Sequence, residues 1–143
     1  MKYSQSRNYL DYMDAYAAGD LQRARTALEA CLGEVQQSGS PAQQADLLQR
    51  IGGIEHELGN VADALKFFRE SESADRDSLL AKYQFARFLA EKLMDHDAAR
   101  RKCDEILELA TVRPFAESED DFGSEEYQRM AKALMVSLRS SQT

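Results

Sequence analysis

The sequence predicts an all-α protein, and three observations lead to that class. Apolar residues recur at steps of three and four along most of the chain, which is the period of a helix with one buried face. Good helix formers (Glu, Ala, Leu, Arg and Gln) dominate the composition, and only two of the 143 residues are proline. Gly-Asn and Gly-Asp pairs interrupt the apolar pattern, as they do where one helix ends and another begins.

The stretch 48–71 shows this organisation most clearly. Gly59 suits the left-handed position after a helix, where glycine pays no steric cost, and Asn60 suits the cap of the next helix. Apolar and small residues lie at helical spacing on both sides of this pair: Leu48, Ile51 and Leu58 before it, and Val61, Ala64, Leu65 and Phe68 after it. The stretch therefore predicts two helices joined by a tight turn.

These residues, together with Gly52, resemble one tetratricopeptide repeat, a helix–turn–helix unit of about 34 residues. The resemblance implies that Gly52 lies where the first helix meets its neighbour, and that Ala64 lies where the second helix crosses the first. Glu55 stands where the family usually has a tyrosine, and Arg76 where it usually has a proline.

Two partial repeats flank the central one, which spans about 42–74. The first covers about 6–37 and contains Asp11 and Arg25 where apolar residues are usual. The third covers about 79–111, and Met94 stands in it where Gly59 stood. The resemblance implies a single domain over 1–143, built as a right-handed helix–turn–helix superhelix, or α-solenoid.

An acidic loop, about 114–124, and a capping helix, about 125–139, complete the predicted domain. The helix is expected because its apolar residues fall on one face: Tyr127, Met130, Ala131, Leu134, Met135 and Leu138. The last repeat of a stacked array has an open apolar face, which a terminal helix with a polar outside normally covers.

The net charge of −7 is concentrated in one place, because six acidic residues and no basic ones lie in 117–126. The rest of the chain is close to neutral, which argues against binding to nucleic acid or to an anionic membrane. Neither an apolar run of about 20 residues nor a secretory apolar segment is present, so we expect a cytoplasmic protein by default. Export by a dedicated system that needs no such signal stays open.

Chemistry-bearing residues are few, and their spacing does not favour a catalytic or metal site. Cys31 and Cys103 lack metal-ligand spacing and are expected to be two reduced, packed thiols. His96 lies between two aspartates, but adjacent residues on a turn point apart, so a helix-cap turn is preferred. Because no catalytic or phosphate-binding motif is present, we expect neither an enzyme nor a cofactor.

In the family, the first helix of each repeat lines a concave groove that holds a partner. The resemblance implies the following groove residues: Tyr9, Met13, Tyr16 and Ala17, then Gln49, Gly53, His56 and Glu57, then Gln84, Phe88, Glu91 and Lys92. Tyr9, Met13 and Phe88 either contact the partner or pack in the core, and the sequence leaves both open. Some members clamp a peptide carboxylate with lysine and asparagine, which Tyr9 and Met13 replace here, so an apolar helix or strand fits better.

Three functions are consistent with these features. The first is an adaptor or chaperone that binds a protein or peptide segment in the groove. The second is a self-associating module, a homodimer formed through Tyr9, Met13 or the last helix. The third is an inhibitor or immunity-type protein that binds a basic partner through the acidic segment, with these contact residues: Glu117, Glu119, Asp120 and Asp121.

Overall fold

The computed structural model describes residues 6–111 and 123–140, and these residues form seven α-helices and no strand. The all-α prediction is therefore confirmed for the described chain. The helices are α1 (Arg7–Ala17), α2 (Leu21–Ser38), α3 (Pro41–Glu57), α4 (Val61–Ala74), α5 (Leu79–Glu91), α6 (His96–Ala110) and α7 (Ser124–Ser140).

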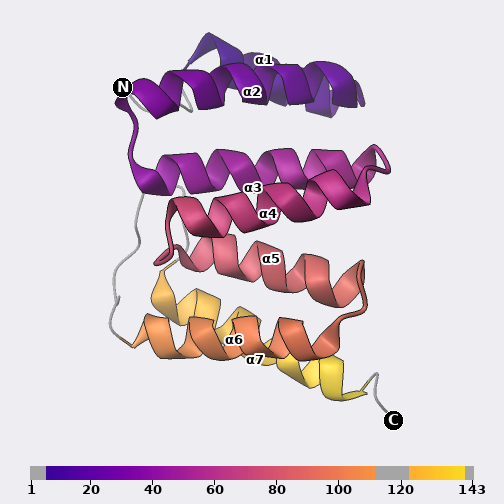
Figure 1. The fold of residues 1–143 in the computed structure, drawn as a ribbon, viewed down its shortest axis with the longest axis vertical. Helices are drawn as coiled ribbons and strands as arrows, with labels where there is room; N and C mark the ends of the chain where they lie inside the picture. The colour runs from indigo at the N-terminus through magenta and orange to yellow at the C-terminus, as the bar shows by residue number, and fades with distance from the viewer. Residues whose placement is uncertain (1–5, 112–122, 141–143) are drawn as a thin grey trace. The chain divides into compact units, whose positions relative to one another are not determined.

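Two compact units make up the chain, Met1–Arg76 and Asp77–Thr143, and each is described by itself. In the first unit, α1 packs against α2, α2 against α3, and α3 against α4 (Figure 1). In the second unit, α5 packs against α6, and α7 packs against both of them. Helix packing in this order is consistent with a helical repeat.

Three helical hairpins, α1–α2, α3–α4 and α5–α6, each have a residue with positive φ directly before the second helix's cap. Gly19 and Gly59 take positive φ angles of 77° and 87° at the first two turns. Met94 takes the equivalent conformation at the third turn, with φ 55°, and is the one non-glycine residue with positive φ in the described chain. A side chain in this left-handed region is strained, so Met94 is an unfavourable residue at the position that glycine holds elsewhere.

Buried positions recur at the same distances from the three helix caps, Asp20, Asn60 and Asp95. A fully buried alanine lies four residues after each cap. Further buried residues lie eight and eleven residues after each cap, and all of them are apolar except one serine. These positions are Ala24, Ala64 and Ala99, then Leu28, Phe68 and Cys103, then Cys31, Ser71 and Ile106. The second helix of each hairpin therefore buries the same stripe.

Gly52 shows why small residues occur in this pattern. A Cβ atom added at Gly52 would lie 3.1 Å from the ring of Phe68, which belongs to the facing helix α4. The absence of a side chain lets α3 and α4 approach closely.

Local capping residues define where the first helix of each hairpin begins. The side-chain oxygens of Ser6, Ser40 and Ser78 accept hydrogen bonds from the third residue of α1, α3 and α5. Ser40 and Gln43 form a reciprocal capping box, and Pro41 occupies the first turn, where its missing N–H costs nothing.

Candidate functional site

The candidate site lies in the first unit, on the face formed by α1 and α3. Tyr9, Tyr12 and Tyr16 are three and four residues apart in α1 and therefore lie on one side of the helix. Neighbouring ring centroids are 5.4 Å and 6.0 Å apart, with tilted planes. The three rings form a continuous aromatic row directed towards α3.

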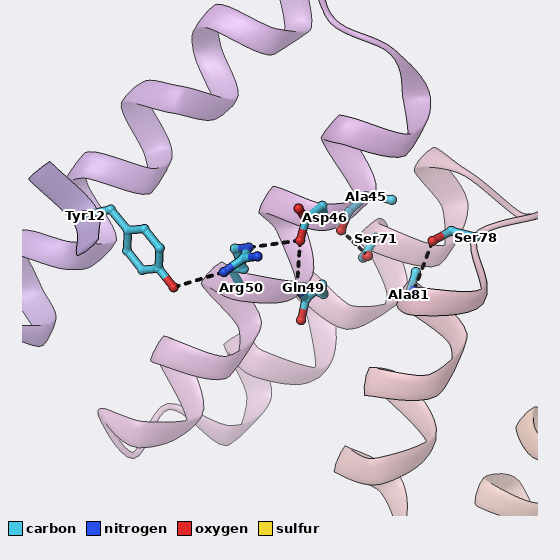
Figure 2. A network of polar contacts seen from close by, with 8 residues as sticks. All are labelled: Tyr12, Ala45, Asp46, Gln49, Arg50, Ser71, Ser78 and Ala81. Atoms are coloured by element: carbon cyan, nitrogen blue, oxygen red, sulfur yellow. Dashed lines mark hydrogen bonds and ion pairs between the residues drawn. The ribbon is translucent and has the colours of Figure 1, made fainter. Parts of the chain in front are cut away.

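Arg50 extends from α3 to this row (Figure 2). Its guanidinium lies 5.7 Å from the centroid of the Tyr9 ring, and Nη1 donates a hydrogen bond of 3.4 Å to the Tyr12 hydroxyl. The nitrogen Nε donates to the carboxylate of Asp46 at 2.9 Å. The amide of Gln49 donates to the same carboxylate at 3.0 Å, so the network contains one cation and one anion.

Electrostatics keep Arg50 charged. Burial alone would lower the pKa of Arg50, but the nearby carboxylate of Asp46 and the hydroxyl of Tyr12 raise it above its usual value. Because Asp46 already neutralises the guanidinium, Arg50 contributes an aromatic-stacked surface more than an unpaired charge.

A second link between α1 and α3 joins two groove positions that the sequence predicted. The hydroxyl of Tyr16 donates a hydrogen bond of 2.8 Å to the carboxylate of Glu57. This hydrogen bond is the main reason that the pKa of Tyr16 is raised above its usual value. Tyr16 is 43% exposed, so its ring contributes to the surface.

The predicted groove residues of the first unit differ in exposure. Tyr9 and Gln49 are buried, each with 9% exposure, and Tyr9 belongs to the core cluster of this unit. Met13 is 51% exposed, and His56 is half-buried. A Cβ atom added at Gly53 would meet nothing within 4 Å, so the backbone of α3 is open there.

The third hairpin has a different register, because its turn is one residue longer. The amide nitrogens of Asp20 and Asn60 bond to carbonyls five residues earlier, on Ala15 and Glu55. The amide nitrogen of Asp95 instead bonds to Leu89, six residues earlier. Helices α1, α3 and α5 all end two residues after these acceptors. The three helices are therefore aligned so that the acceptors Ala15, Glu55 and Leu89 occupy equivalent positions.

In this alignment the α5 positions that match the groove residues of α1 and α3 are Tyr83, Arg87, Ala90 and Glu91. Counting back from Asp95 instead selects Gln84, Phe88 and Lys92, the residues that the repeat resemblance implies, so the two alignments differ by one residue. Gln84 is half-buried and Lys92 is exposed, whereas Phe88 has 4% exposure and aligns with Ile54, which is also buried. A signal for the extra residue was present, since the sequence around Met94 lacks the glycine of the other turns.

Two residues that depart from the repeat pattern contact each other. Arg25 in α2 donates a hydrogen bond of 2.7 Å to Glu55 in α3, and Asn60 donates to the other carboxylate oxygen at 3.0 Å. Glu55 is buried, with 3% exposure. The two departures therefore compensate for each other, a pairing that helical spacing alone does not reveal.

Residues 117–122 of the acidic segment proposed as a second site lie outside the described residues, and Glu125 and Glu126 belong to the first turn of α7. The four proposed contact residues are all within 117–122: Glu117, Glu119, Asp120 and Asp121.

Other candidate chemistry is limited in the described residues. Cys31 and Cys103 are free and buried, and burial raises the pKa of the Cys103 thiol to about 11, so the thiol stays protonated at neutral pH. No cluster of three histidine, cysteine or carboxylate side chains is placed to hold a metal ion in 6–111 and 123–140. Among the described helices, none combines the length and apolar character needed to span a bilayer.

Comparison with known proteins assigns no family to the chain. No family model matches it, and no curated protein sequence is significantly similar to it.

Proposed function

We propose that the protein is a binding scaffold of tetratricopeptide type that holds a segment of a partner protein against the α1–α3 face. It would act as an adaptor or chaperone in the cytoplasm and not as an enzyme. A right-handed superhelical arrangement of the hairpins belongs to the same proposal.

One observation carries the proposal: α1 and α3 present matching positions on one face, and their side chains meet there. The Tyr16–Glu57 hydrogen bond and the Tyr12–Arg50 hydrogen bond both connect the two helices. Aromatic side chains with a polar tip are favoured at protein interfaces, because they offer a large rigid contact area and a hydrogen-bonding group.

The open backbone at Gly53 is a second observation that supports the proposal. Glycine inside a helix costs roughly 1 kcal/mol relative to alanine, and no neighbour requires its small size here. The open backbone at Gly53 lets a partner segment approach α3 between Arg50 and Glu57.

The contacts around Arg50 favour an apolar segment with hydrogen-bonding groups over a terminal carboxylate. Asp46 already pairs with the guanidinium at 2.9 Å, and a second carboxylate would have to displace it. Exposed Met13 and Tyr16 beside this pair provide adaptable apolar contact area.

The test uses affinity capture from lysate of the source cell, with captured proteins quantified by mass spectrometry. The variant Gly53→Arg places a long side chain on the candidate face without a clash at Cβ. We expect a partner captured by the wild type to fall at least tenfold with this variant.

A matched control is available in the chain. A Cβ atom at Gly33 in α2 also meets nothing within 4 Å, so Gly33→Arg makes the same change on another helix. Gly33→Arg should retain the partner. Equal retention by both variants would place binding elsewhere, and the absence of any captured partner would count against the scaffold function.

A further inference from the structure

Helix α1 has a second exposed face, separate from the tyrosine row. Arg7, Leu10, Asp14 and Ala17 follow one another at steps of three, four and three residues, and all four are exposed. At about 100° per residue, these positions fall within one narrow strip along the helix. We refer to these four residues as the outer stripe of α1; Met13 lies at its edge.

The outer stripe faces away from the packed side of α1. Tyr12 and Ala15 are buried on that packed side, whereas Leu10 is 53% exposed and Met13 is 51% exposed. Two of the large exposed apolar residues of the described chain therefore lie next to each other on an 11-residue helix. No ion pair joins Arg7 or Asp14 to another residue of the described ranges.

The order of charges on the stripe is self-complementary. Arg7 and Asp14 are seven residues apart, and Leu10 lies between them. If a second copy is rotated by 180° and laid antiparallel, Arg7 faces Asp14 of the partner subunit, and the same pair forms again by symmetry. Leu10 then lies near the two-fold axis, where it contacts its own copy.

We propose that the outer stripe of α1 is the contact surface of a homodimer, in which Leu10 and Met13 are covered and the Arg7–Asp14 pairs set an antiparallel orientation. The occupant is a second copy of this chain. The outer stripe shares Ala17, and Met13 at its edge, with the predicted groove. Arg7, Leu10 and Asp14 carry the inference and are not groove positions, so the charge swaps test the dimer without changing the groove.

The dimer should be weak. An 11-residue helix offers less contact area than the roughly 1,600 Å² buried in a standard stable interface. Two exposed ion pairs add orientation more than affinity. The net charge of −7 also opposes association. We therefore expect a dissociation constant on the order of 100 µM.

The decisive experiment is sedimentation equilibrium on the full chain over a concentration series, with charge-swap variants. R7E places two carboxylates opposite each other, and D14R places two guanidinium groups opposite each other. Each single variant should weaken dimerisation at least tenfold, and R7E/D14R should restore it to within about twofold of the wild type.

The control R69E makes the same change of net charge at an exposed position on α4 and should leave the dissociation constant unchanged. L10E should abolish the dimer, with far-ultraviolet circular dichroism confirming that the helices persist. A wild type that remains monomeric throughout the series would overturn the proposal. Failure of the double swap to restore association, or equal loss with R69E, would also overturn it.

Discussion

Two adjacent glycines in α3 have opposite structural roles. The ring of Phe68 occupies the space beside Gly52, whereas nothing lies within 4 Å of a Cβ atom at Gly53. Sequence analysis placed both in a helix, but only the packing of α4 against α3 distinguishes them. One glycine permits helix packing, and the other exposes backbone on the candidate site.

This difference leads to a prediction on stability. Gly53→Ala should raise the free energy of unfolding by about 1 kcal/mol, because alanine is the better helix former. Gly52→Ala should lower it by about 1 kcal/mol or more, since the added Cβ crowds the Phe68 ring and outweighs the gain in helix propensity. Urea denaturation followed by circular dichroism measures both changes.

Gly33→Ala is the control, because Gly33 is also open and should behave like Gly53. Equal stability of the Gly52→Ala and Gly53→Ala variants would show that Phe68 moves freely, contrary to the close packing of α3 and α4.

At the scale of the element, the helical hairpin is the unit that repeats. A residue with positive φ before the cap and a fully buried alanine four residues after it recur in α1–α2, α3–α4 and α5–α6. The first hairpin and the second are connected by the Arg25–Glu55 pair, which replaces apolar packing at one point between α2 and α3. Removing one partner of such an ion pair costs more when the charge left behind is buried than when it can reach water. Glu55 is the buried partner here, and Arg25 is the more accessible one.

We expect Arg25→Leu to lower the free energy of unfolding by about 2–3 kcal/mol, because the buried carboxylate of Glu55 then lacks its cation. Glu55→Leu should cost less, about 1 kcal/mol, since Arg25 can reach water when released. The double variant should be more stable than the sum of the two losses predicts, with a coupling of about 1–2 kcal/mol measured by chemical denaturation.

The exposed pair between Arg23 and Asp11 is the matched control. Arg23→Leu should change stability by less than about 1 kcal/mol, as is usual for surface ion pairs. Strict additivity of Arg25→Leu and Glu55→Leu would mean that their contact does not stabilise the fold.

At the scale of the whole molecule, α7 provides the final covering layer of the second unit. Tyr127, Ala131, Leu134 and Leu138 are buried on one face of α7, and the helix packs against α5 and α6. The ring of Tyr127 lies 6.3 Å from the ring of Tyr83 in α5. Each large side chain buried here contributes roughly 1.5–3 kcal/mol.

A chain that ends after Gly123 should therefore be insoluble or oligomeric. This truncation lacks α7 and therefore uncovers apolar residues of α5 and α6. Exposed apolar patches of that kind drive association. Light scattering of the purified protein measures the change. A chain that ends after Ser140 keeps α7 and should behave as the wild type; a soluble, monomeric product of the shorter truncation would refute the capping role.

Sequence alone determined the all-α class, the turns at Gly19 and Gly59, and most helix limits. These features depend on local interactions: apolar period, capping side chains and the conformational freedom of glycine. The placement of Tyr16 on a face shared with Glu57 also followed from helical spacing combined with the repeat resemblance.

Tertiary structure alone decided the register of α5, the pairing of Arg25 with Glu55, and the different surroundings of Gly52 and Gly53. The extra residue before Asp95 is located by the hydrogen bond from the Asp95 amide to Leu89, and it shifts the α5 positions that align with α1 and α3 by one residue. Each of these features depends on which side chain approaches from another helix. Periodicity within one helix defines its buried face, but the residues that meet across two helices are determined only when the helices pack.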